Sequence, residues 1–96
     1  MCIRDRLDVA LIFDEVINGF RLHQRGAQAW YNVEADIVAY GKAVSGGLPL
    51  AICAGKERYM NSFDGGYWQY GDDSIPEGSI SYFAGTFIKN LSLIHI

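Results

Sequence analysis

The chain alternates short apolar runs with turn-forming and charged residues. The first run, residues 7–13 (LDVALIF), ends at two adjacent carboxylates, Asp14 and Glu15. A short, almost continuous apolar run predicts a strand that is buried on both faces, as in a parallel sheet. Residues 35–40 (ADIVAY) and 48–54 (LPLAICA) predict a second and a third strand, with Pro49 limiting hydrogen bonding near the start of the third.

Between and after these strands the pattern changes to turns and short helices. Asn18-Gly19 and Arg25-Gly26 mark turns, residues 27–31 predict one helical turn, and residues 56–63 predict a helix. Glycine, aspartate and serine dominate residues 64–79, which predicts a long loop, and residues 83–87 (FAGTF) begin another element. Short buried strands that alternate with turns and brief helices indicate the α/β class. The few strands would form an incomplete sheet, so we expect part of a larger domain.

The composition narrows the function classes. Half of the 96 residues are apolar and 20% are charged, which is typical of a globular domain. The net charge is -3 and no basic run is present, so neither nucleic acid nor an anionic membrane is an expected partner. No apolar window reaches the length of a transmembrane helix, and the N-terminus lacks the apolar core of a signal peptide. We therefore expect a cytoplasmic protein with reduced thiols.

The two ends do not continue the pattern of their neighbours. MCIRDR at residues 1–6 and LSLIHI at residues 91–96 resemble translated sequencing adapters, and segments of that kind are set aside in an analysis of fold. An ordinary N-terminus and an ordinary C-terminal strand are the alternative. On the adapter interpretation, the native sequence covers residues 7–90.

Asp14 and Lys42 are the two residues with the clearest chemical potential. Each follows a predicted strand, and ligands of open α/β sheets bind beyond the carboxyl ends of the strands. Gly41, immediately before Lys42, would allow the backbone to turn sharply. A buried carboxylate is costly without a positive partner, so the partner of Asp14 is expected to reveal the function. A lysine amine and an aspartate suit pyridoxal 5'-phosphate: the amine forms a Schiff base, and the carboxylate pairs with the protonated pyridine nitrogen.

A second class of function fits the same strand. ALIFDE also reads as a Walker B strand of a P-loop ATPase, in which Asp14 holds magnesium and Glu15 activates water. The companion loop G-x-x-x-x-G-K-[ST] is absent, because Gly41-Lys42 is followed by Ala43 and preceded five positions back by Asp36. A non-catalytic segment that only dimerises or scaffolds is the third alternative.

Four sequence segments together resemble one family. They are the hydrophobic-Asp-Glu-Val segment with GFR, the GAQ segment, the D-(x)4-GK segment and GGLP, in that order. With Lys42 standing 28 positions after Asp14, the chain resembles class III (subgroup II) pyridoxal-phosphate aminotransferases of the glutamate-1-semialdehyde aminomutase type. The resemblance spans residues 7–90. It implies a piece of the large cofactor-binding domain of fold type I, a mixed and mostly parallel sheet with flanking helices.

The resemblance also implies residue roles. Lys42 would form the Schiff base and move protons, Asp14 would pair with the pyridine nitrogen, and Val16 would pack against one face of the ring. Thr86, in FAGTF, would contact the cofactor phosphate of the neighbouring subunit of a homodimer. Glu15 is expected to have a structural hydrogen-bonding role, and Gly46-Gly47 to permit close backbone approach near the lysine loop. No metal site is expected.

The substrates are less well specified. The segment at residues 63–76 (FDGGYWQYGDDSIP) is similar to that of aminotransferase domains embedded in polyketide and nonribosomal peptide synthetases. This implies an amino donor and a keto or semialdehyde acceptor, including an acyl chain bound to a carrier protein. Family members also bind the cofactor through segments that correspond to sequence before residue 7. The 96-residue chain alone is therefore expected to be inactive.

Four further side chains have plain interpretations. His23 is expected to be a solvated loop residue without a metal-binding partner, and Cys53 a small buried hydrophobe. The loop aromatics Tyr67, Trp68 and Tyr70 fit a substrate entrance, a dimer contact or the cover of the loop's own core.

Overall fold

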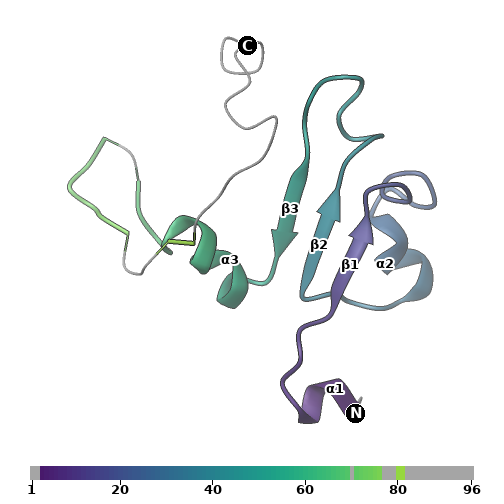
Figure 1. Cartoon of the computed structure of the whole chain (residues 1–96), viewed down its shortest axis with the longest axis horizontal. Coiled ribbons are helices and arrows are strands. Elements are labelled where there is room, and N and C mark those ends of the chain that lie inside the picture. Colours follow the sequence, from purple (N-terminus) through teal and green to yellow (C-terminus); the bar gives the residue numbers. More distant parts are fainter. Residues whose placement is uncertain (1–2, 70, 77–79, 82–96) are drawn as a thin grey trace.

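The computed structural model describes residues 3–69, 71–76 and 80–81. Its elements are α1 (Ile3–Arg6), β1 (Ile12–Glu15), α2 (Gly26–Tyr31), β2 (Ile37–Tyr40), β3 (Ile52–Gly55) and α3 (Glu57–Asp64). Figure 1 shows the three strands side by side in the order β1-β2-β3, with α2 behind β1 and α3 after β3. No helix within the described ranges is long and apolar enough to cross a membrane.

The sheet is mixed. β1 and β2 run parallel, with Asp14 opposite Ala39 and Glu15 opposite Tyr40, whereas β3 returns antiparallel to β2. The predicted α/β class and mixed sheet are therefore confirmed. The connection from β2 to β3 turns through Gly46 and Gly47, whose φ angles of 56° and 93° favour glycine.

The three strands lie where the sequence predicts them, but the first and the third begin later than predicted, at Ile12 and at Ile52. Residues 7–11 precede β1, which instead includes both carboxylates of the predicted strand end. The expectation that this strand is buried on both faces is wrong, since the side chain of Ile12 is 63% exposed. In the described residues only Ala27, Ala35 and Val38 form a buried apolar core, because too few elements are present to cover both faces of the sheet.

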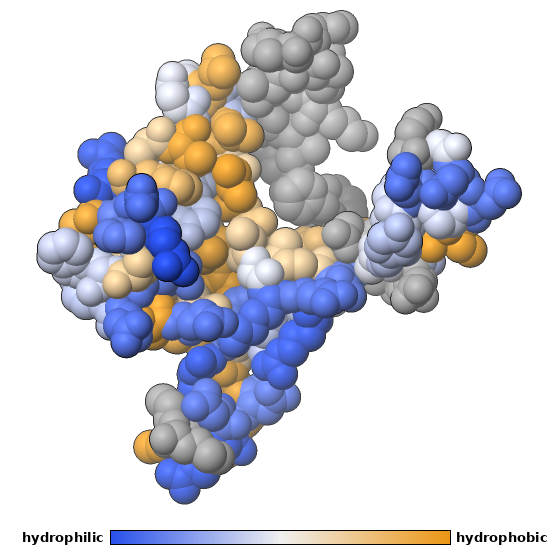
Figure 2. Space-filling view, turned by 180° about the vertical axis from the view of Figure 1, so that it is seen from behind, coloured by the Kyte–Doolittle hydropathy of each residue, from blue (hydrophilic) through white to orange (hydrophobic). Residues whose placement is uncertain are grey.

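The surface divides into an apolar and a polar region. In Figure 2, apolar side chains gather over the sheet and the β2–β3 connection, while polar residues cover α3 and the N-terminal segment. Several large apolar side chains of the first region are more than one third exposed, namely Leu48, Leu50 and Ile52. Cys53 is also exposed, so its predicted burial is wrong for the same reason.

Asp36, just before β2, forms bonds to the residue that precedes β1 and to the residue that follows β3. Its buried carboxylate accepts a hydrogen bond from the Leu11 backbone N–H (2.8 Å) and pairs with Lys56 Nζ (2.9 Å) and with Arg4. The hydrogen bond from Lys56 is the main cause that holds the pKa of Asp36 well below its ordinary value, while burial acts in the opposite direction. The same bond raises the pKa of Lys56. This explains structurally why an aspartate opens the D-(x)4-GK segment.

Both predicted helices are present, with ends that lie within one residue of the predicted bounds. α2 ends at Asn32, which adopts a left-handed conformation (φ 52°) and donates its N–H to the Gln28 carbonyl oxygen. α3 ends in the same way at Gly65 (φ 84°). The described residues from 65 to 76 form no helix or strand, as expected for the long loop. α1 lies in the segment predicted to be non-native, and that prediction, like the 7–90 boundary, stays a prediction.

Candidate functional site

The two carboxylates at the end of β1 have opposite environments. Glu15 is 2% exposed, and its oxygens accept hydrogen bonds from the backbone N–H groups of Ala27 (2.7 Å) and Gln28 (3.3 Å). These are the first turn of α2, where N–H groups have no partner within the helix. Glu15 therefore caps α2, which agrees with its expected structural role.

Asp14, in contrast, is exposed. The premise that Asp14 is a buried carboxylate is therefore wrong in the described chain, because successive side chains of a strand point to opposite faces and it is Glu15 that points inward. One oxygen of Asp14 accepts the Val16 N–H at 3.0 Å, which turns the chain at the strand end. Across the parts of the chain that the structure describes, no basic side chain pairs with Asp14.

Lys42 lies just beyond β2, at the same edge of the sheet as Asp14. Its amine is not paired with any carboxylate of the described residues. The sharp turn occurs at Lys42 itself, whose φ of 37° lies in the left-handed region, rather than at Gly41 as expected. The Lys42 carbonyl accepts hydrogen bonds from the Ser45 hydroxyl (2.6 Å) and the Ser45 N–H (3.2 Å), which hold this turn.

Gly41 is needed for space. It is buried, and a Cβ atom at this position would lie 3.2 Å from Cγ1 of Val16. The lack of a side chain at Gly41 thus lets the turn after β1 approach the turn after β2. Gly46 and Gly47 differ from expectation: an added Cβ would meet nothing within 4 Å, so they serve backbone conformation and not close approach.

Three of the four predicted site residues line one pocket. It has a volume of about 350 Å³ and is lined by Asp14, Val16, Ile17, Asn18 and Lys42. Thr86, the fourth predicted residue, lies outside the described residues. Sequence reasoning did not single out Ile17 and Asn18 as lining residues; their position between Val16 and the Asn18-Gly19 turn was the available signal.

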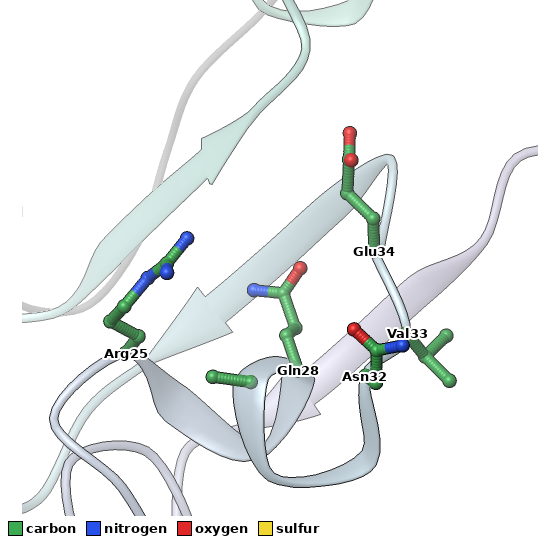
Figure 3. A pocket seen from close by; sticks show the side chains of 6 residues that line it. Arg25, Gln28, Asn32, Val33 and Glu34 are labelled. Atoms are coloured by element: carbon green, nitrogen blue, oxygen red, sulfur yellow. The ribbon is translucent and has the colours of Figure 1, made fainter.

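A larger hollow, of about 460 Å³, lies beside α2 and does not include these residues. Figure 3 shows Arg25 before the helix, Gln28 on it, and Asn32, Val33 and Glu34 after it. Its charged side chains, Arg25 and Glu34, are exposed and stand on opposite flanks of α2. The smaller pocket is the candidate site, because it combines a lysine amine with a carboxylate beyond the carboxyl ends of two parallel strands, where open α/β sheets bind ligands.

His23 and the loop aromatics that the structure describes, Tyr67 and Trp68, do not line the candidate pocket. Nδ1 of His23 accepts the Arg25 N–H at 3.0 Å, and no group of metal-binding side chains occurs among the described residues. Tyr67 is 83% exposed and Trp68 38%, while Tyr70 lies outside the described residues.

The Walker B interpretation is not supported by this geometry. The glutamate that would activate water is Glu15, and its two oxygens are occupied by the backbone of α2. It is buried and faces away from the pocket that Asp14 lines.

Comparison with known proteins gives a consistent result. A family model for class-III aminotransferases matches residues 2–92. The chain is 45% identical over 82 residues to a glutamate-1-semialdehyde 2,1-aminomutase of Methanosphaera stadtmanae, covering 85% of this chain and 16% of that protein. It is 44% identical over 86 residues to the aminomutase of Methanopyrus kandleri, covering 90% of this chain and 17% of that protein.

A solved structure is similar as well. The chain matches a transaminase with PLP bound at a TM-score of 0.65 and 30% identity, over 88% of this chain and 18% of that one. The chain thus spans less than a fifth of the length of the proteins it matches. None of these comparisons supports an ATPase. The match to the family model over most of the sequence shows that the chain belongs to the class-III aminotransferase family.

Proposed function

We propose that this chain supplies the lysine and the carboxylate that hold pyridoxal 5'-phosphate in a larger aminotransferase or aminomutase. The single observation that carries the proposal is the shared pocket of Asp14, Val16 and Lys42, in a chain of the class-III family. The reaction would be transfer of an amino group to a keto compound, or internal exchange as in an aminomutase.

The pocket residues fit this cofactor. The volume of about 350 Å³ lies within the range of small-molecule pockets. The cofactor has an aldehyde that condenses with an amine and a ring nitrogen that, when protonated, needs an anion; the pocket offers one amine and one carboxylate, neither paired with an opposite charge in the described residues. When bound, the cofactor supplies an electron sink for the negative charge left when a proton leaves the substrate carbon.

Each residue would have one task. Lys42 would bond covalently to the cofactor and, once released by an incoming amine, carry a proton at Nζ. Asp14 would keep the ring nitrogen protonated, and its bond with the Val16 N–H fixes the direction of the carboxylate (3.0 Å). Val16 would cover one side of the ring, because it lies against Gly41 at the base of the lysine turn.

The remaining features of the proposal rest on the family resemblance. Thr86 would bind the phosphate of the neighbouring subunit, so that the full-length protein would act as a homodimer in the cytoplasm. The amino acceptor would be a keto acid or semialdehyde, or an acyl chain on a carrier protein. The native part of this sequence would be residues 7–90 of the large domain.

The test uses the full-length protein that contains this segment. It is incubated with pyridoxal phosphate, reduced with borohydride and digested, and the modified peptide is identified by mass spectrometry. We expect a pyridoxyl group on Lys42 and none on Lys56, whose amine is paired with Asp36 and Glu34. Lys42→Arg, which keeps the charge, should abolish the label. A label confined to other lysines would refute the assignment.

Asp14→Asn provides an independent test. The amide keeps the size of the side chain but cannot stabilise a protonated ring nitrogen by charge. We expect the Lys42 label to remain and turnover to fall by two orders of magnitude or more, since about 3 kcal/mol of charge-assisted stabilisation is removed from the transition state. Turnover near that of the unsubstituted protein would exclude Asp14 from this role.

A further inference from the structure

The Tyr40 side chain contacts three residues from other parts of the chain, although the proposed chemistry does not use it. It is the last residue of β2 and stands two positions before Lys42. Its hydroxyl accepts a hydrogen bond from Nε2 of Gln28 at 3.3 Å, and its ring packs against Phe20 with centroids 5.1 Å apart and an interplanar angle of 45°. Together with Gly19 on the same ring, these contacts form what we call the Tyr40 clamp.

Gly19 is the closest part of the clamp. A Cβ atom added to Gly19 would lie 2.5 Å from Cδ1 and 3.0 Å from Cε1 of Tyr40, so no larger residue fits without moving the ring. Its N–H donates to the Glu15 carbonyl oxygen at 2.9 Å, which fixes this loop to the end of β1. Through Gly19, the position of the Tyr40 ring edge is therefore fixed relative to β1, the strand that carries Asp14.

Phe20 shows that the clamp has a cost. Its φ of 63° lies in the left-handed region, which is unusual for a bulky residue and costs roughly 1 kcal/mol or more. The strain is compensated in part by the contact with Tyr40, since aromatic pairs contribute about 0.5–1.5 kcal/mol beyond burial. Lys42, two residues after Tyr40 in the chain, also has a φ in the left-handed region (37°).

The Gln28 side chain joins the clamp to α2 and β2. Its oxygen accepts the Ala35 N–H at 2.9 Å while its nitrogen donates to Tyr40, so the amide has one defined orientation. Its backbone N–H is bonded to Glu15, so the position of the amide is tied to the end of β1 as well.

We infer that the Tyr40 clamp is a positioning device: Gly19, Phe20 and Gln28 fix Tyr40, and through it the turn that presents the Lys42 amine to the pocket it shares with Asp14. The GFR and GAQ segments, which have no direct contact with that pocket, converge on this one ring. The inference rests on the proposed function of Lys42 and adds Tyr40 and Gln28 as positioning residues.

The experiment compares two reactions of Lys42 in the full-length protein without cofactor. Attachment of pyridoxal phosphate, followed by absorbance and borohydride trapping, needs an oriented amine. Acetylation by acetic anhydride needs only an accessible amine. Tyr40→Phe removes the hydroxyl and keeps the ring, so the protein should fold normally, as checked by its melting temperature.

For Tyr40→Phe we expect attachment at Lys42 to slow about three- to tenfold, the factor to which the loss of one hydrogen bond corresponds. Acetylation of Lys42 should stay within twofold of the unsubstituted protein. Gln28→Glu removes the Nε2 donor, but the Tyr40 hydroxyl can then donate to one carboxylate oxygen while the other accepts the Ala35 N–H, so this variant should retain most of the attachment rate. Tyr31→Phe, at a tyrosine on α2 that is 65% exposed, is the matched control and should change neither reaction.

The possible results distinguish a failure of the proposed function of Lys42 from a failure of the positioning role of the Tyr40 clamp. If the unsubstituted protein attaches no cofactor at Lys42, the proposed function fails and this inference with it. If the unsubstituted protein does attach cofactor at Lys42, and Tyr40→Phe attaches it at a rate within twofold of that of the unsubstituted protein, the clamp has no positioning role. Equal slowing of acetylation and attachment would also overturn the inference, since it would show a general disturbance of the lysine turn.

Discussion

Glu15→Ala should loosen α2 without altering the chemistry of the neighbouring Asp14. The carboxylate of Glu15 is 2% exposed and accepts the backbone N–H groups of Ala27 and Gln28 at the start of the helix. Removing it leaves two N–H groups of a six-residue helix without a partner. A helix this short depends on such contacts, because its own hydrogen bonds barely offset the cost of nucleation.

The magnitude follows from the two bonds. The bond to Ala27, at 2.7 Å, is charge-assisted and short, and is worth about 1.5–3 kcal/mol; the longer bond to Gln28, at 3.3 Å, adds about 0.5–1 kcal/mol. The opening free energy of α2 should therefore fall by about 2–4 kcal/mol. At 1.4 kcal/mol per factor of ten, this corresponds to roughly 30- to 700-fold faster amide exchange.

Hydrogen exchange in the full-length protein, read by mass spectrometry on a peptide that contains α2, measures this change. Asp14→Ala is the matched control: it removes an exposed carboxylate one position away, and exchange in α2 should change by less than threefold. Protection of α2 in Glu15→Ala that equals the unsubstituted protein would refute the capping role. Loss of protection across the whole protein in both variants would show that the effect is not local.

Three further outcomes are expected. Gly26→Ala should destabilise the protein by about 2 kcal/mol or more in urea unfolding, because its φ is 78° and the new Cβ would lie 2.6 Å from an oxygen of the helix-capping carboxylate; an unchanged unfolding midpoint would contradict the geometry. Asp36→Asn should flatten the decrease of stability below about pH 4 by up to one proton: the hydrogen bond from Lys56 holds the pKa of Asp36 below that of an unfolded aspartate, so its contribution is present above about pH 4 and is lost as the pH falls toward the folded pKa. Identical slopes of unfolding free energy against pH in both proteins would refute this. Gly41→Ala should weaken pyridoxal phosphate binding about three- to tenfold, because a Cβ there would press on Val16 at 3.2 Å, and an unchanged dissociation constant by absorbance titration would exclude that contact from the site.

The strands were predictable because their apolar runs are short and bounded by turn residues. Residues 35–40 contain the whole of β2, whereas β3 begins four residues after the start of the predicted strand 48–54 and extends to Gly55. The start of β1 was not predictable, because residues 7–11 are as apolar as a strand. Only the pairing of Ile12 with Ile37 decides where the ladder begins. Burial failed for Ile12 and Cys53, since a strand pattern indicates which faces are apolar but not whether other elements cover them.

Asp14, Val16 and Lys42 are assigned roles by the family resemblance, and the sheet brings these three residues to one pocket. Their roles stay predictions. The distinction between the two adjacent carboxylates required the structure, because both follow the same apolar run and only strand alternation decides which one turns inward. The Tyr40 clamp was also out of reach, since its members, Gly19, Phe20 and Gln28, meet only after the chain has folded back.

The parallel pairing of β1 with β2 has a consequence for how such sequences can vary. The separation between Asp14 and Lys42 is set by one step across the ladder and a short turn, so it does not depend on how much chain connects the strands. Insertions and deletions at the outer bend of residues 21–24, which contribute neither to the pocket nor to the Tyr40 clamp, should be neutral for the chemistry. A single residue added between Ile37 and Lys42 would rotate the amine to the opposite side of the sheet, so natural length variation should be absent there.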